Sequence, residues 1–197
     1  MASIMLPTSP GARGAKPMLI SFGGVLTPFL GGPTQRINRL GTRWAMRFVM
    51  PPIAAEQARY WVSALARGVD RGAIMRIPQD IDVGDPGTPL ISAAVSAGTT
   101  LPLKGLPAGY AVKDGQFLSI IHAGQRYTHQ FAADAIVSAG GTLDASIWPM
   151  IRVGLFVNDV VEIAEPMIEG WLDAQFEYDI LSVPYVQLPD FTISERR

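Results

Sequence analysis

Cysteine is absent from the 197-residue chain, which excludes disulfide bonds, thiolate zinc sites and a cysteine nucleophile. Charged residues are scarce, at 17% of the chain, where soluble domains typically have about a quarter. No continuous run of about 20 apolar residues is present, so we expect no membrane insertion. The first 18 residues lack the apolar core of a signal peptide, which predicts a protein kept in a cytoplasm-like compartment.

The chain also lacks the short motifs of common catalytic and nucleotide-binding sites: HExxH, the P-loop, GxSxG and GxGxxG are all missing. Its two histidines are His122 and His129. A two-residue turn at 123–124 would place His129 opposite Leu118, roughly 13 Å from His122 and too far away for one metal ion. We therefore interpret both histidines as structural and expect no catalytic residue, no metal and no cofactor.

Three aspartates, Asp80, Asp82 and Asp85, lie close together in a segment that resembles a calcium-binding loop. No glutamate follows at the twelfth position of that loop, and two prolines interrupt the segment. We interpret residues 79–89 as a solvated linker between two parts of the chain.

Charge is divided unevenly along the sequence. Residues 1–76 contain 10 basic and 2 acidic side chains, a net +8, whereas residues 77–197 contain 6 basic and 15 acidic ones, a net −9. This division suits attraction between the two ends of one domain, attraction between neighbouring subunits, or a basic face that binds phosphate. The overall charge of −1 disfavours direct nucleic-acid readout.

The candidate contacts between subunits follow from this division. Most of the basic residues are arginine, which pairs with carboxylates in a bidentate manner. The candidates are Arg36, Arg39, Arg43, Arg47 and Arg76 on the basic side, and Glu162, Glu165, Glu169, Asp173 and Glu177 on the acidic side. We interpret the acidic set as an exposed flank; paired carboxylates in a hydrolytic site are the alternative.

The four tryptophans divide by position. Trp44 and Trp61 lie on the apolar faces of a predicted strand and a predicted helix, which indicates core packing. Trp148 and Trp171 lie at the ends of predicted elements, next to Pro149 and Gly170 respectively. We interpret Trp148 and Trp171 as candidate contacts to a partner protein, with glycan stacking as the alternative.

Hydrophobic periodicity predicts many strands and one helix. Residues 43–50 alternate, with Trp44, Met46, Phe48 and Met50 on one face and a basic outer face. Residues 54–66 have the apolar spacing of an amphipathic helix that Gly68 ends. Further strands are expected in these ranges: 18–22, 72–78, 90–95, 99–104, 117–122, 125–132, 141–147, 159–163, 175–181 and 185–188. Residues 191–197 are interpreted as a polar tail.

These elements predict a mainly β fold: a β-sandwich with one packed α-helix and an inserted small antiparallel β-barrel, OB-like or galectin-like. Residues 1–17 are expected to form a flexible N-terminal arm. Residues 18–80 and 172–197 are assigned to the sandwich, and residues 88–168 to the barrel.

Several segments, in this order, resemble small minor tail proteins of long-tailed, non-contractile bacteriophages. The first half contains 32–37 (GPTQRI), 39–44 (RLGTRW), 50–53 (MPPI) and 58–61 (ARYW). The second half contains 106–110 (LPAGY), 113–120 (KDGQFLSI), 125–127 (QRY), 148–152 (WPMIR) and 191–195 (FTISE). The similarity covers most of the chain from about residue 19 and rests on the order of the segments.

The resemblance implies a distal tail protein, a structural virion protein whose hexameric ring joins the tail tube to the hub of the tail tip. Implied partners are other copies of the chain, the tube protein, a hub protein and the tape-measure protein. The implied location is the virion, after assembly in the host cytoplasm. Two alternatives stay open: another connector ring, such as a tail terminator or head-completion protein, and a small glycan-binding or hydrolytic tail module.

Overall fold

The computed structural model describes residues 2–37, 39–173 and 184–196. Its largest sheet has six strands in the order β1-β7-β16-β18-β5-β2. Their bounds, in chain order, are β1 (Ile4–Met5), β2 (Gly14–Ile20), β5 (Arg43–Val49), β7 (Ala73–Arg76), β16 (Met167–Leu172) and β18 (Phe191–Glu195). Strands from both ends of the chain meet in this sheet, so the barrel-forming residues are an insertion between its parts.

The helix α1 (Ala55–Arg71) packs against this sheet because its apolar side chains recur on one face. Trp61 and Leu65 of α1 are fully buried, together with Met46 and Phe48 of β5 and Ile193 of β18. The helix is longer than the expected 54–66. Gly68 lies within it, where it contacts Leu172, and the chain instead leaves the helix at Gly72, which has a φ of +84°.

The second unit is a closed barrel with the strand order β11-β12-β14-β9-β8-β15. The bounds in chain order are β8 (Leu90–Ile91), β9 (Gly98–Lys104), β11 (Phe117–His122), β12 (Gln125–Phe131), β14 (Thr142–Ile151) and β15 (Val160–Glu162). Its interior holds its own cluster of buried apolar residues, among them Leu101, Leu118 and Phe131. The short strands β10 (Ala111–Val112) and β13 (Ala135–Ile136) pair beside it.

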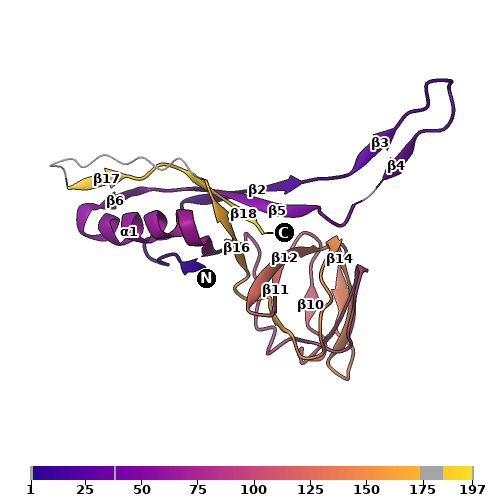
Figure 1. Ribbon diagram of the computed structural model, residues 1–197. Coiled ribbons are helices and arrows are strands. Elements are labelled where there is room, and N and C mark those ends of the chain that lie inside the picture. The colour runs from indigo at the N-terminus through magenta and orange to yellow at the C-terminus, as the bar shows by residue number, and fades with distance from the viewer. Residues whose placement is uncertain (1, 38, 174–183, 197) are drawn as a thin grey trace.

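Two further strand pairs complete the fold. Strand β17 (Tyr185–Gln187) pairs with β6 (Pro52–Ala54), which lies just before α1. Strand β3 (Gly24–Leu26) pairs with β4 (Gln35–Ile37). In Figure 1, α1 and the barrel lie side by side beneath the extended strands β2 and β5, while the β3–β4 hairpin projects away from both.

The fold class expected from the sequence is confirmed: the protein is mainly β, with one packed helix among the described residues and a small closed antiparallel barrel. The expected hairpin at 123–124 is also confirmed, since Leu118 pairs with His129. Trp44, Met46 and Phe48 of β5, and Met50 directly after it, are buried as the alternation predicts.

Three expectations were wrong. Residues 1–17 are not a flexible arm, because β1 pairs with β7 and β2 pairs with β5. Residues 191–195 are not a polar tail: β18 pairs with both β16 and β5, and its alternate residues Phe191, Ile193 and Glu195 are buried. The sheet resumes after the barrel at β16 rather than at residue 172, because β16 pairs with β7 from Met167 onward. The expected strand at 175–181 lies outside the described residues.

Candidate interaction surfaces

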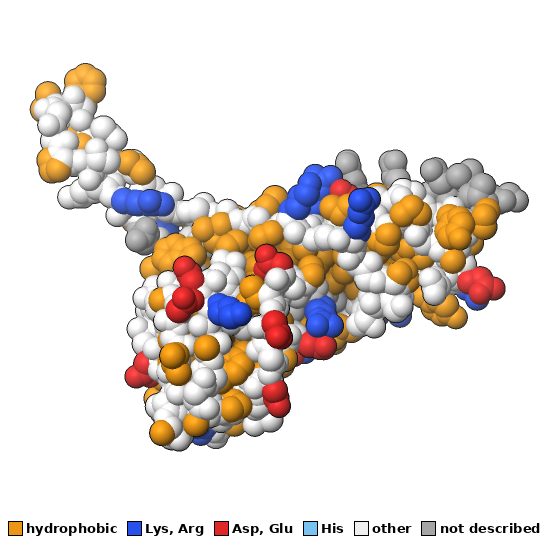
Figure 2. Space-filling view, turned by 180° about the vertical axis from the view of Figure 1, so that it is seen from behind, with side chains coloured by type: hydrophobic (Ala, Val, Ile, Leu, Met, Phe, Trp, Pro, Cys, Tyr) orange, Lys and Arg blue, Asp and Glu red, His pale blue; other side chains and the backbone are white. Residues whose placement is uncertain are grey.

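The projecting hairpin, which we define as residues 23–37, presents apolar side chains to solvent. Phe29 and Leu30 at its tip are 101% and 94% exposed, and Val25 and Leu26 on β3 are also exposed. Among the described strands, β3 and β4 pair only with each other. Figure 2 shows hydrophobic side chains gathered at the tip of this projection and Lys or Arg side chains near its base. A large apolar side chain that its own chain leaves fully exposed is typical of a contact surface.

Local sequence explains why the chain projects here. Gly24 begins β3, and the segment from Gly31 to Pro33 turns the chain back toward β4, with a φ of +79° at Gly31. At the base, the guanidinium of Arg43 stacks over the ring of Phe22 at 4.8 Å from its centroid. A Cβ at Gly41 would lie 3.2 Å from the Phe22 ring, so glycine permits this packing. The base is therefore anchored to β5, while the tip has no cover.

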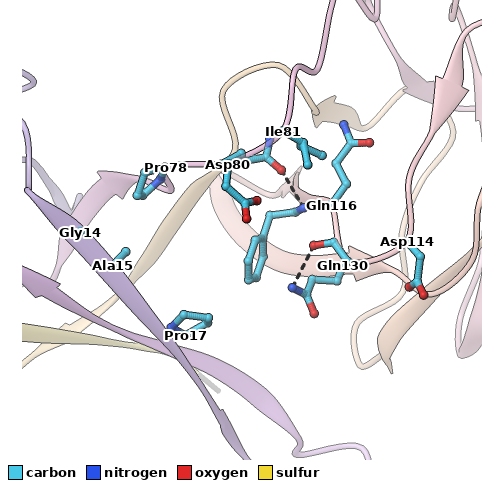
Figure 3. Close-up of a pocket in the computed structure, with 12 residues that line it drawn as sticks. Gly14, Ala15, Pro17, Pro78, Asp80, Ile81, Asp114, Gln116 and Gln130 are labelled. Carbon is cyan, nitrogen blue, oxygen red and sulfur yellow. Dashed lines mark hydrogen bonds between the residues drawn. The ribbon is translucent and has the colours of Figure 1, made fainter.

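A cleft of about 660 Å³ lies between β2 of the sheet and the barrel. Figure 3 shows Ala15 and Pro17 of β2 on one side of this space and Gln130 of the barrel on the other, with Asp80 pointing into it. Phe117 also lines the cleft, and its backbone N–H donates to Gln79 Oε1. Gln130 Nε2 likewise donates a hydrogen bond to the Gly115 carbonyl. These polar groups of the cleft lining are therefore already paired within the chain.

The cleft is acidic. Asp80 and Asp114 line it, and no lysine or arginine does so in the part of the chain that the structure describes. Both aspartates are exposed, and neither belongs to an ion pair with another described residue. Apolar walls with two unpaired carboxylates fit an apolar segment that carries positive charge.

The predicted basic residues lie in two places. Arg36 is on the projecting hairpin, paired across it with Val25, and Arg39 and Arg43 lie at its base. Arg47 and Arg76 lie on the sheet and make exposed ion pairs with acidic residues of the same chain, Arg47 with Asp190 at 3.0 Å and Arg76 with Glu165 at 3.1 Å. Part of the charge division therefore serves attraction within one subunit and not between subunits.

The predicted acidic flank is not a single exposed surface. Glu162 forms a bidentate pair with Arg126 at 2.9 and 3.0 Å. Glu169 is 4% exposed and accepts hydrogen bonds from Ser3 Oγ and the Arg126 backbone N–H. Glu165 and Asp173 are exposed. Glu177 lies outside the described residues. For Glu169 the prediction of an exposed contact residue was wrong, because the folded barrel covers it.

Glu195 is the buried acidic residue that sequence reasoning missed. At 1% exposure, its carboxylate accepts hydrogen bonds from the backbone N–H groups of Trp44 and Thr128 and forms an ion pair with Arg152 at 2.9 Å. Burial raises the pKa of Glu195, opposed first by Arg152 and then by these hydrogen bonds. The alternation of Phe191, Ile193 and Glu195 on one face of β18 is the sequence signal that could have placed it inward.

His122 and His129 each make a polar contact within the chain. His122 Nδ1 lies 2.8 Å from Asp159 Oδ2, and His129 Nδ1 lies 2.7 Å from the Pro149 carbonyl. Burial lowers the pKa of His129 to about 4, against the effect of the Pro149 hydrogen bond and with a smaller contribution from Arg152.

The predicted linker contains local turns. The carboxylates of Asp82 and Asp85 accept hydrogen bonds from the backbone N–H groups of Gly84 and Gly87. No group of three or more metal-ligating side chains is found among residues 2–37, 39–173 and 184–196.

The burial of the four tryptophans follows the expectation, but Trp148 lies within β14 and not at the end of a strand. Trp44 and Trp61 are buried, whereas Trp148 and Trp171 are exposed. The Arg196 guanidinium stacks over the Trp171 ring at 4.3 Å from its centroid, so part of the Trp171 surface is already covered by its own chain.

No known protein family and no curated protein matches this chain in sequence. Among the described residues, no helix combines the length and the apolar character needed to cross a membrane.

Proposed function

We propose that the protein is a structural subunit that assembles into a ring at the distal end of a phage tail, where it joins the tail tube to the tip. The projecting hairpin is the observation that carries this proposal. A folded chain that holds two large apolar side chains fully in solvent, on a strand pair with no other cover, gains stability when a second protein covers them.

The size of that gain is large enough to matter. Burying one Phe or Leu side chain is worth about 1.5–3 kcal/mol, so covering Phe29 and Leu30 supplies about 3–6 kcal/mol for each hairpin. In a closed ring every subunit donates one hairpin and receives another, so this term recurs at every interface. The hairpin therefore supports assembly more directly than the charge division, part of which is neutralised within the subunit.

The placement at the tail tip rests on the order of segments shared with small minor tail proteins. Under this proposal the protein acts by shape and contact and carries no catalytic step. The ring would have the tube protein on one face and a hub protein on the other.

Imaging tests both parts of the proposal. We expect negative-stain or cryo-electron microscopy of the purified protein to show closed rings, and gold-labelled antibodies to bind the distal end of intact tails. Labelling at the head end of the tail would assign the chain to a tail terminator or head-completion ring instead. A monomer that is absent from virions would overturn the proposal.

A further inference from the structure

The projecting hairpin and the acidic cleft are complementary in chemistry. The hairpin carries Phe29 and Leu30 at its tip and Arg36 on β4, and it contains no acidic residue. The cleft has apolar walls at Pro17, Pro78 and Phe117 and two aspartates, Asp80 and Asp114, at its edges. We infer that the projecting hairpin of one subunit docks in the sheet–barrel cleft of the next copy; this inference rests on the proposed ring.

Charge favours this cleft over two other hollows on the described surface. A hollow of about 390 Å³ at the base of the hairpin is lined by Arg39, Arg43 and Arg152 and by no carboxylate among the described residues, so it offers Arg36 no acidic partner. A hollow of about 340 Å³ beside β1 is lined by Arg76 and by its ion-pair partner Glu165, so its one carboxylate is already paired. The sheet–barrel cleft is also the largest of the three, and it alone combines carboxylates with no basic lining residue among those described.

The hairpin and the cleft lie on different parts of one subunit, and this determines the type of contact that two copies can make. The hairpin extends beyond the Ile20 end of β2, whereas the cleft is lined by Gly14, Ala15 and Pro17 at the other end of β2. A contact between two unlike patches is head-to-tail, and head-to-tail contacts close into rings or continue as filaments. Because the hairpin and the cleft of this chain complement each other in charge and apolar character, the occupant of the cleft is a second copy of the chain.

A cysteine cross-link tests this docking, because the natural chain has no cysteine that would interfere. One preparation carries Thr27→Cys, an exposed position next to the tip that leaves Phe29 and Leu30 in place, and the other carries Ala15→Cys; the two are mixed under mild oxidation. We expect a disulfide-linked dimer of one copy of each. The matched control replaces Ala15→Cys by Phe156→Cys, a position that is 66% exposed on the barrel and outside the cleft. The control should cross-link at least about tenfold more slowly.

Four results would overturn the docking. Equal cross-linking rates in the test and control mixtures would show that the tip has no preferred site. In a third preparation, which carries both cysteines in one chain, a disulfide formed within that chain would show that the hairpin folds back on its own cleft. Rings seen by electron microscopy without the cross-link between positions 27 and 15 would refute the docking and leave the proposed ring standing. Absence of any assembly would refute both.

Charge exchange provides a second, independent readout. Arg36→Glu should weaken association about fivefold at low salt, since exposed ion pairs are worth up to about 1 kcal/mol. Adding Asp80→Lys and Asp114→Lys to the same chain should restore it. Arg67→Glu on the exposed surface of α1 is the matched control and should leave association unchanged. A failure of the triple variant to recover, with its thermal unfolding unchanged, would contradict the docking.

Discussion

The carboxylate of Glu195, in the last strand of the sheet, accepts a hydrogen bond from the backbone N–H of Thr128 in the barrel, 67 residues earlier in the chain. The same carboxylate binds the Trp44 backbone N–H on β5 and pairs with Arg152. One buried side chain thereby joins the sheet to the barrel and fixes the walls of the cleft relative to each other.

Glu195→Gln should destabilise the protein by about 2–4 kcal/mol. The substitution replaces one acceptor oxygen by an amide donor, so one backbone N–H loses its acceptor and Arg152 loses its counter-ion in a buried site. Chemical denaturation measures the change. The matched control is Glu165→Gln, an exposed partner of Arg76, which should cost no more than about 0.5 kcal/mol. Equal costs for the two variants would contradict the role given to Glu195.

Folding stability should decrease as the pH falls from about 6.5 to about 4 because of His129. Its pKa is near 6.5 in the unfolded chain and about 4 in the folded protein, so the unfolded state binds the proton more tightly. Above pH 6.5, His129 is neutral in both states and costs no stability. At pH 5, protonation of the unfolded chain lowers the free energy of unfolding by about 2 kcal/mol.

His129→Asn isolates this effect. Asparagine keeps a donor near the position of Nδ1, which lies 2.7 Å from the Pro149 carbonyl, but it does not titrate. The raised pKa of Glu195 acts in the opposite direction, yet it is present in both proteins and cancels in the difference between them. Denaturation at pH 7.5 and pH 5 should show the extra loss in the natural protein only. A parallel pH dependence in the two proteins would refute the assignment.

Gly170→Ala should disrupt the centre of the sheet. Gly170 pairs with Glu195 on β18 and with Ala73 on β7, and a Cβ there would overlap the Ser194 backbone carbonyl. Because backbone cannot move aside as a side chain can, we expect a cost of at least about 3 kcal/mol or loss of soluble protein. Gly154→Ala is the control, since a Cβ at this position would have no atom within 4 Å and the φ of Gly154 is not positive. Normal stability of the Gly170 variant would contradict the described register.

The sequence predicted those helices and strands in which the spacing of apolar residues alone shows which face is buried. The alternation of Trp44, Met46, Phe48 and Met50 and the apolar face of α1 are of this kind. The burial of Glu195 could not be predicted in the same way, because its partners at Trp44 and Thr128 are distant in sequence. In addition, the polar residues Thr192 and Ser194 led to the interpretation of this segment as a polar tail.

The candidate surfaces were predicted less well than the fold. Charge counts identified Arg47 and Arg76 as basic, but the pairing of each within its own chain depends on the tertiary structure. The projecting hairpin was missed because Phe29 and Leu30 have the composition of a core segment. Their exposure follows from the strand pairing of β3 with β4 alone among the described strands.

The most direct test of the account compares the assembly state of the natural protein with that of a Phe29→Ser, Leu30→Ser variant by mass photometry. Phe156→Ser is the control, because it removes an exposed phenylalanine outside the hairpin. We predict closed oligomers for the natural protein and the control, and a folded monomer with unchanged thermal unfolding for the hairpin variant. Oligomers of the same size and affinity in all three proteins would contradict the account.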